Sequence, residues 1–235
     1  MKVIILAGGE GTRLRPLTFA IPKPLIPIGE KPILEIIITR LKRFGFKEFV
    51  LSVGYKAELI KTYFQQGERF GVNINYVHED RPLGTAGSLK MISRQFRFKK
   101  EESFLLMNGD ILTRLDFRRM WSTHQRNNSD LTVGIKKFIQ KIPFGVMDIK
   151  EGLIQGITEK PVESYCVSAG IYMVKVSSLK YIPENKAFTM PMLINAALKK
   201  KKKVFAYPIR EDWIAVEHID HIEEINDNLE RWIKE

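Results

Sequence analysis

The sequence has little cysteine, no long apolar run and comparatively few acidic residues, and each shortage excludes a class of protein. Cys166 is the only cysteine among 235 residues. An intrachain disulfide is therefore excluded, and a reducing compartment suits the chain. No apolar stretch approaches the ~20 residues that a membrane-spanning helix needs. The first one, Val3 to Ala7, is also too short for the core of a signal peptide. We expect a cytoplasmic protein without a membrane partner.

Acidic residues are outnumbered, with 27 Asp and Glu against 38 Lys and Arg and a net charge of +11. Such a balance suits nucleic acid, a membrane surface or polyanionic small substrates. The most basic stretch, Lys199 to Lys203, ends a helical pattern, where lysines favour the helix dipole. No aromatic interleaving or nucleic-acid motif accompanies it. We prefer a solvated surface to a polyanion site and expect no nucleic-acid partner, while a homo-oligomer is left open.

The first half of the chain alternates apolar β-like runs with helical patterns. Strands alternating with helices of 10–15 residues indicate a mostly parallel sheet that is covered on both faces. The strand-like runs are 3–7, 49–53, 72–78 and 103–110, and each precedes an amphipathic stretch. In open sheets of this kind, ligands bind beyond the carboxyl ends of the strands. In this chain those strand ends carry three glycines after the first run, the segment HED (78–80) after the third and the segment NGD (108–110) at the end of the fourth.

After about Asn127 the pattern changes to short β-like runs separated by turns, which indicates mixed or antiparallel strands added to the first sheet. A terminal amphipathic helix is expected from about Asp220, with Ile222, Ile225, Leu229 and Ile233 on its buried side. We predict a single α/β domain over 1–235. Its nucleotide-binding half covers about 1–127 and its second half about 128–235.

The loop AGGEGTRLRP, which follows the first strand, suits phosphate but fits neither common phosphate motif. A P-loop needs G-x-x-x-x-G-K-[ST], and a dinucleotide fingerprint needs a third glycine that opens a helix. This chain has no lysine and Ser/Thr pair there, has leucine at the third-glycine position, and continues into prolines. Gly8, Gly9 and Gly11 can offer backbone N–H groups at close range. Arg13 can hold phosphate oxygens in a bidentate pair, and Lys23 adds a charge.

Several segments of the sequence resemble those of a known enzyme family. The stretch LAGGEGTRLRPLTFAIPKPLIPIGEKPILE resembles the signature of the sugar-1-phosphate nucleotidyltransferases. Further similar segments are EDRPLGTAGSL (79–89), LLMNGDIL (105–112), PFGVMDI (143–149), ITEKP (157–161) and SAGIY (168–172). The resemblance implies a Rossmann-like nucleotide-diphospho-sugar transferase fold. It also implies a Mg²⁺-dependent reaction between a nucleoside triphosphate and a sugar-1-phosphate.

The resemblance implies roles for residues of the first half. Arg13 and the glycine loop would hold the triphosphate, and Lys23 would lie near the reacting phosphates. The segment LGTAGSL would lie beside the base. Its sequence is similar to that of guanylyltransferases acting on mannose, heptose or amino-sugar phosphates, and this similarity favours GTP. The nucleotide-binding set is Leu6, Gly8, Gly9, Gly11, Thr12, Arg13, Glu79, Gly84, Thr85 and Gly109.

Asp110, at the end of an apolar run, is the candidate Mg²⁺ ligand, because hard cations take carboxylate oxygens. The alternative is an N-cap for the helix that follows. On the sugar side, the resemblance places Lys160 near the sugar phosphate, Glu159 near a ring hydroxyl and Gly145 close to the sugar. Ser168 stands where relatives usually carry asparagine. Because the sequence ends with its terminal helix, we expect no further C-terminal domain of the kind that some relatives carry.

One departure from the family pattern concerns the metal. Many relatives carry W-x-D-x-G near the C-terminus, whereas this sequence has Trp213, Ala215 and Glu217 at those positions. Three accounts are open: Glu217 or Asp212 replaces the missing ligand, Asp110 and water suffice, or the chain binds nucleotide without turnover. His218 and His221 form no convincing metal site, since no third ligand is evident. We prefer an active transferase to a non-catalytic binding protein, and either to a nucleic-acid binder.

Overall fold

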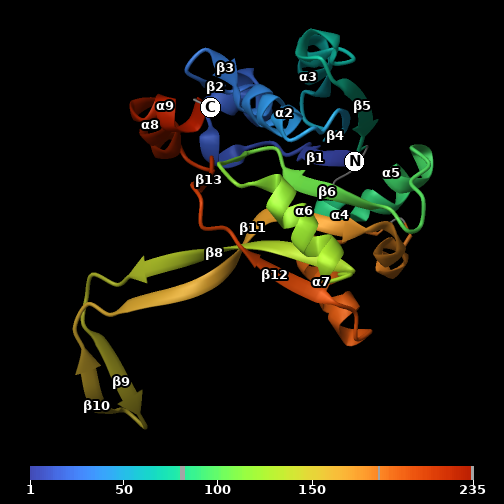
Figure 1. Ribbon diagram of the computed structural model, residues 1–235. Coiled ribbons are helices and arrows are strands. Elements are labelled where there is room, and N and C mark those ends of the chain that lie inside the picture. The colour runs from blue at the N-terminus through green and yellow to red at the C-terminus, as the bar shows by residue number, and fades with distance from the viewer. Residues whose placement is uncertain (80–82, 185, 234–235) are drawn as a thin grey trace.

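The computed structural model describes residues 1–79, 83–184 and 186–233. Within them, seven strands form one sheet in the order β12-β8-β11-β6-β1-β4-β5 (Figure 1). Their bounds are β1 Lys2–Ala7, β4 Glu48–Val53, β5 Asn73–His78, β6 Ser103–Asn108, β8 Leu131–Lys141, β11 Val162–Lys175 and β12 Val204–Pro208. The strands β6, β1, β4 and β5 are parallel, and β11 is antiparallel to both β6 and β8. The predicted α/β fold with a mixed second half is confirmed.

Helices cover both faces of this sheet. The alternation of β1 divides its side chains, so that Val3 and Ile5 join one buried cluster with α2 while Ile4 joins the other with α5 and α7. The α-helices are α1 Leu17–Ala20, α2 Ile33–Arg43, α3 Ala57–Phe64, α4 Gly84–Gly87, α5 Leu89–Gln95, α6 Phe117–Arg126, α7 Met190–Lys199, α8 Ile219–Asp227 and α9 Leu229–Ile233. Short 3₁₀ turns are η1 Thr12–Leu14, η2 Lys23–Leu25, η3 Glu68–Phe70 and η4 Val176–Tyr181.

Three small antiparallel pairs complete the chain. They are β2 Pro27–Ile28 with β3 Lys31–Pro32, β7 Ile111–Thr113 with β13 Trp213–Ala215, and β9 Val146–Lys150 with β10 Leu153–Thr158. The second pair matters for the site, because it brings the C-terminal segment beside the residues that follow Asp110. A backbone bond from Val216 N to Asp110 O, at 2.9 Å, extends this pairing.

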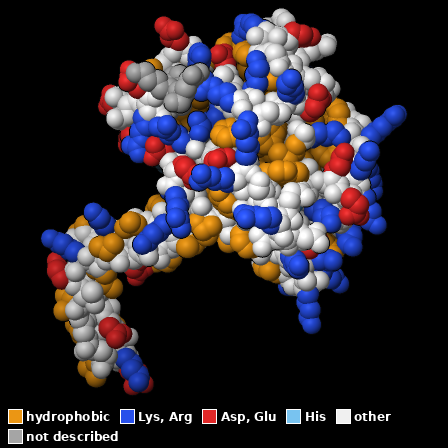
Figure 2. Space-filling view, in the orientation of Figure 1, with side chains coloured by type: hydrophobic (Ala, Val, Ile, Leu, Met, Phe, Trp, Pro, Cys, Tyr) orange, Lys and Arg blue, Asp and Glu red, His pale blue; other side chains and the backbone are white. Residues whose placement is uncertain are grey.

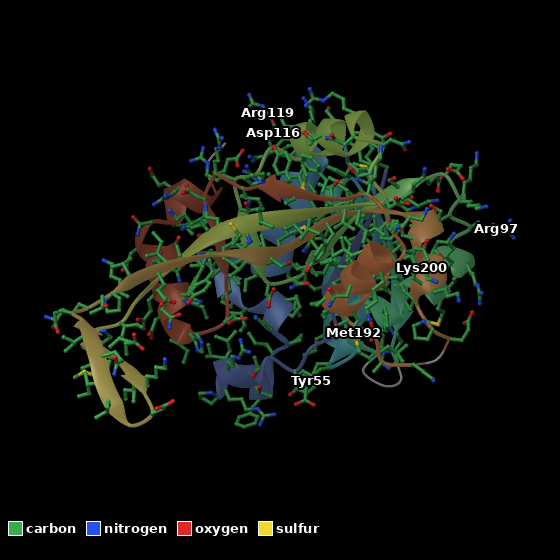
Figure 3. All side chains as sticks on the ribbon, turned by 90° about the horizontal axis from the view of Figure 1, so that it is seen from below. Tyr55, Arg97, Asp116, Arg119, Met192 and Lys200 are labelled. Carbon is green, nitrogen blue, oxygen red and sulfur yellow. The ribbon has the colours of Figure 1, made fainter. Side chains whose placement is uncertain are left out.

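One of these elements, the terminal helix, differs from the sequence prediction. The terminal helix is interrupted at Asn228, whose backbone leaves the helical region, so α8 and α9 replace one continuous helix. Ile225 is fully buried, and Trp232 of α9 is also buried. Asp116 caps α6, since its side chain accepts hydrogen bonds from the backbone N–H groups of Arg118 and Arg119. The side chains of Asp116 and Arg119 also lie close together (Figure 3).

The outer parts of β8 and β11 leave the sheet together and carry the β9–β10 hairpin at their end (Figure 1). We call residues 136–167 the arm. No residue of the arm is buried, and the structure describes all of them. Among the residues described in the whole chain, no helix is long and apolar enough to cross a membrane.

Candidate active site

A cavity of about 620 Å³ lies at the carboxyl ends of the parallel strands. This is the edge where ligands of open α/β sheets bind. Its walls come from four strand ends and two loops of the first half of the chain. The lining residues are Leu6, Ala7, Gly8, Gly9, Glu10, Gly11, Lys23, Pro24, Gly54, Tyr55, His78, Glu79, Gly84, Thr85, Asn108, Gly109 and Asp110.

The glycine loop takes its shape from close backbone contacts with neighbouring strand ends. A Cβ on Gly54 would lie 2.9 Å from Gly8 O, so the two backbone segments approach more closely than a side chain at Gly54 would allow. Tyr55 N donates to Gly8 O at 3.1 Å, and Tyr55 Oη donates to Thr18 O at 2.9 Å. Tyr55 therefore ties the glycine loop to the proline-rich loop behind it, and it lies beside the N-terminal segment (Figure 3).

Lys23 and Asp110 form the charged pair of the cavity. Lys23 Nζ lies 2.5 Å from Asp110 Oδ2, and the side chains are only 15% and 25% exposed. The other carboxylate oxygen, Asp110 Oδ1, is buried and has no hydrogen-bond partner. An unpartnered buried carboxylate oxygen is costly, and it is a natural ligand for a hard cation. Asp116, not Asp110, caps the following helix, so the N-cap alternative for Asp110 is wrong.

Arg13 and Thr12 belong to the predicted nucleotide set but do not line the cavity. Arg13 Nη1 instead lies 2.6 Å from Glu217 Oε2, in a half-exposed pair. This pair joins the glycine loop to the C-terminal segment. Since Arg13 is exposed and long, a phosphate at the mouth of the cavity would compete with Glu217 for it.

Glu79, Gly84 and Thr85 line the cavity as part of the predicted base-binding loop. Glu79 accepts from Ser52 Oγ at 2.5 Å and from Leu83 N at 3.3 Å, so both of its carboxylate oxygens hold protein groups. Gly84 has φ +75°, and a Cβ there would lie 2.8 Å from Phe188 O. Thr85 Oγ1 accepts from Met190 N. These bonds fix the loop against the start of α7. The adjoining predicted segment 80–82 lies outside the described residues.

The predicted sugar-phosphate residues do not line this cavity. Gly145, Glu159 and Lys160 lie in the arm, where a Cβ on Gly145 would be 3.0 Å from Glu159 Oε2. Ser168 lies at the base of the arm and shares a 2.8 Å hydrogen bond with Tyr172 Oη. The structure therefore brings Asp110 together with most of the nucleotide candidates, places Gly145 beside Glu159 in the arm, and leaves Ser168 at the base of the arm.

The C-terminal segment offers little to replace the missing aspartate. Ala215 pairs with Ile111, next to Asp110, but it presents only a methyl group there. Asp212 is held by Arg231 in a bidentate pair, and Arg231 lowers its pKa. Glu217 is paired with Arg13. Among the described residues, no three His, Cys, Asp or Glu side chains form a metal-holding group. The donor set fits a cation that is held partly by substrate phosphates.

Several lining residues were missed in the sequence prediction, namely Ala7, Glu10, Pro24, Gly54 and Tyr55, while His78 and Asn108 lie in the two strand ends that it placed at this edge without naming them individually. The rule that ligands meet strand ends could have found some of them. Gly54 and Tyr55 follow the second parallel strand directly, and Asn108 ends the fourth. Pro24 carries no such signal, because its position depends on how the proline-rich loop folds back.

The family model described as nucleotidyl transferase matches residues 2–231. The chain belongs to this family. It is 35% identical to the D-glycero-alpha-D-manno-heptose 1-phosphate guanylyltransferase of Aneurinibacillus thermoaerophilus, over 86% of this chain and 87% of the relative. The resemblance to sugar-1-phosphate nucleotidyltransferases is thereby confirmed.

Other family relatives are longer than this chain. A mannose-1-phosphate guanyltransferase of Yarrowia lipolytica is 38% identical over 77% of this chain and 51% of the relative. A UTP–glucose-1-phosphate uridylyltransferase of Synechocystis is 32% identical over 100% of this chain and 65% of the relative. The chain thus spans about half to two thirds of these two. Its fold is also similar to the crystal structure of HddC from Yersinia pseudotuberculosis, with a TM-score of 0.74 over 97% of this chain and 99% of that one, at 24% identity.

Proposed function

We propose that this family member transfers a nucleotidyl group from a nucleoside triphosphate, GTP by preference, to a sugar-1-phosphate. A phosphate oxygen of the sugar-1-phosphate attacks the α-phosphorus. The bond from that phosphorus to the oxygen that bridges it to the β-phosphorus breaks, and pyrophosphate leaves with the bonding electrons. The products are a nucleoside diphosphate sugar and pyrophosphate.

The observation that carries the proposal is the Lys23–Asp110 pair at the glycine-lined end of the cavity. Direct displacement between two polyanions needs alignment and charge neutralisation rather than a protein nucleophile. The cavity supplies a lysine, backbone N–H groups and one carboxylate oxygen without a partner. These groups match that requirement.

Each residue has a defined task in this proposal. Lys23 exchanges its bond to Asp110 for the phosphate oxygens and balances their charge. Asp110 then has both oxygens for Mg²⁺, which when bound neutralises charge on the phosphates. Arg13 leaves Glu217 to hold the outer phosphates of the triphosphate. The residues of the arm, Glu159 and Lys160 with Gly145, receive the sugar phosphate, and Ser168 influences which sugar is accepted.

The preference for GTP rests on the loop that contains Gly84 and Thr85. Two of the relatives above are named guanylyltransferases and one uridylyltransferase. Gly84 lines the cavity, where its backbone groups could read the hydrogen-bonding edge of a base. We therefore expect GTP to bind more tightly than UTP.

A second candidate function is favoured by Ala215. With a methyl group beside Asp110 and Glu217 engaged by Arg13, Asp110 is the one carboxylate available for a metal among the described residues of the cavity. Such a site suits a protein that binds a nucleotide or nucleotide sugar without converting it.

A pyrophosphate-release assay separates the two functions. GTP, UTP, ATP and dTTP are each tested with Mg²⁺ against mannose, glucose, heptose and amino-sugar 1-phosphates, with thermal stabilisation by each nucleotide measured in parallel. Sugar-dependent release that disappears in Lys23→Ala and Arg13→Ala supports the transferase. Thermal stabilisation by a nucleotide without release in any pair supports the binding protein.

A further inference from the structure

The arm projects from the body of the molecule, and its own residues do little to fix its direction. Figure 2 shows this projection on the face that it draws. No residue of the arm is buried. Among the residues that the structure describes, one arm side chain hydrogen bonds to the body, because Lys136 Nζ donates to Glu211 O at 2.7 Å. The direction of the arm is therefore set mainly at its base.

The base of the arm contains an irregularity in strand pairing. Ser168 of β11 pairs with Ile135 of β8, and the pairing resumes only at Tyr172, so a β-bulge lies between them. A bulge bends its strand and leaves the extra residues without partners in the ladder. Gly170, inside the bulge, has φ +67°, in the left-handed region. A bulged strand with such a glycine is easily redirected unless another segment holds it.

The segment that runs from β12 past the base of the arm to β13 supplies this hold (Figure 1). We call residues 209–217 the strap. Trp213 Nε1 donates to Ala169 O at 2.9 Å. Ala169 lies in the bulge and is fully buried, so its carbonyl oxygen needs such a partner. Ile209 N donates to Ile135 O at 2.8 Å. The strap is thus bonded to both strands at the base of the arm.

The other end of the strap is fixed to the metal side of the cavity. Val216 N donates to Asp110 O at 2.9 Å, and Asp212 O accepts from Arg114 N at 2.8 Å. Between these two bonds, β13 pairs with β7 directly after Asp110. The strap therefore joins the residue that carries the unpartnered carboxylate oxygen to the carbonyl group next to Ser168.

We propose that Trp213 is a positioning residue that fixes the direction of the arm relative to Asp110. This inference rests on the proposed function, in which the arm receives the sugar phosphate and Asp110 the metal. Direct displacement needs the two phosphates aligned. An arm that samples other directions binds the sugar-1-phosphate only in the competent fraction of molecules, and the apparent affinity falls by that fraction. The bond from Trp213 to Ala169 keeps this fraction high.

The chain supplies a matched control for each bond between strap and arm. Trp213→Phe keeps an aromatic ring and removes the N–H donor, and Trp121→Phe makes the same change on α6, outside the strap. Lys136→Met removes the bond to Glu211 O. Lys137→Met removes the same charge from the next residue, which points to the opposite face of the strand. None of the four substituted side chains is buried, so we expect all four variants to fold.

Initial-rate kinetics test the effect on the sugar, using GTP and the sugar-1-phosphate that gives the fastest pyrophosphate release. In Trp213→Phe the KM for the sugar-1-phosphate should rise at least about fivefold, while kcat and the Kd of GTP stay within about twofold. Lys136→Met should raise the same KM by about twofold or more, and both controls should match the wild type. An unchanged KM in Trp213→Phe, or an equal loss of GTP affinity, overturns the proposal.

A measurement on the arm itself does not depend on turnover. Cys166 is the only cysteine, is exposed and lies in the arm, so it accepts a nitroxide label. Gln125→Cys, at an exposed position of α6, places a second label on the body. Double electron–electron resonance then gives the spread of distances between the two labels. The spread should be wider in Trp213→Phe than in the parent protein, and unchanged in Trp121→Phe.

The two measurements separate failure of this proposal from failure of the proposed function. An equal spread in Trp213→Phe and the parent protein overturns the role of Trp213, even where pyrophosphate is released. A wider spread in Trp213→Phe, without pyrophosphate release from the wild type, supports the hold on the arm and refutes the transferase function.

Discussion

Asp110 shows how one residue can take two roles through its two oxygens. Oδ2 is neutralised by Lys23, while Oδ1 is buried without a partner. A purely structural aspartate would use both oxygens, as Asp116 does when it caps α6 and pairs with Arg119. The free oxygen of Asp110 indicates a ligand that the protein alone does not provide.

Ala215 gives the sharpest prediction at the scale of a residue. It lies opposite Ile111 and next to Asp110, where a carboxylate would add a second oxygen ligand. We expect Ala215→Asp to raise the Mg²⁺-dependent rate of pyrophosphate release at least tenfold, because metal stabilisation of developing charge is worth several kcal/mol. Ala215→Asn, of the same size without the charge, should leave the rate near that of the wild type. Equal effects in the two variants would refute the metal explanation.

His124 predicts a loss of stability in acid. Its ring is buried and bonded to Thr132 Oγ1 and Ser103 Oγ. Burial, with a smaller contribution from Lys175 against Asp130, lowers its pKa from 6.5 to about 4. Below pH 6.5 the unfolded chain binds a proton at this position that the folded chain does not bind. The free energy of unfolding should therefore fall by on the order of 3 kcal/mol between pH 6.5 and pH 4.

Urea unfolding at a series of pH values checks this effect, with His124→Gln as the control. The variant keeps a polar group at the site but does not titrate there. Its free energy of unfolding should be lower at pH 7 and should decline less steeply toward pH 4. Parallel pH profiles for the two proteins would show that His124 is not the group responsible.

At the scale of an element, the glycine loop contains two glycines whose surroundings differ. Gly11 has φ +64°, and a Cβ there would lie 2.9 Å from Thr18 Cγ2 and 3.1 Å from Lys23 Cβ. Gly9 has no heavy atom within 4 Å of such a Cβ. Gly11→Ala should lower the free energy of unfolding by ~1–2 kcal/mol and weaken nucleotide binding, since Lys23 must move. Gly9→Ala should leave stability within ~0.5 kcal/mol of the wild type. Urea unfolding and nucleotide titration distinguish the two changes.

The elements that the sequence predicted well are those with strong local signals. The apolar run before Gly8 and the 3.6-residue periodicity of Ile33–Arg43 identified β1 and α2 directly. The break at Asn228 was missed because the apolar period continues across it. The length of β8 and β11 was also missed. The sequence pattern of a long strand that extends beyond the body is similar to that of several short strands separated by turns.

At the scale of the whole molecule, the cavity could be predicted because parallel strands bring their carboxyl ends to one edge. Gly8 is about a hundred residues from Gly109 and Asp110 in sequence, yet both segments follow a strand of that edge. Ion pairs between distant segments could not be predicted in this way. The Arg13–Glu217 pair depends on β13 returning beside β7, and neither short strand has a distinctive pattern.

The separation of cavity and arm leads to a prediction for the molecule as a whole. Lys141 and Val162 are direct partners in the ladder of β8 and β11, and Ile142 N donates to Pro161 O at 3.1 Å. Residues 142–161 can therefore be replaced by an Asn-Gly turn, which suits a two-residue hairpin connection. No buried residue is removed. The free energy of unfolding should stay within ~1 kcal/mol of the wild-type value, and nucleotide affinity within about twofold.

The same excision should abolish the sugar-phosphate binding that we assign to the arm. The KM of the shortened chain for the sugar-1-phosphate should rise at least tenfold, because Gly145, Glu159 and Lys160 are gone. Ile154→Lys, which changes the arm but keeps these residues, should retain the wild-type KM. If the shortened chain failed to bind nucleotide while remaining folded, the assignment of the nucleotide site to the body would be wrong.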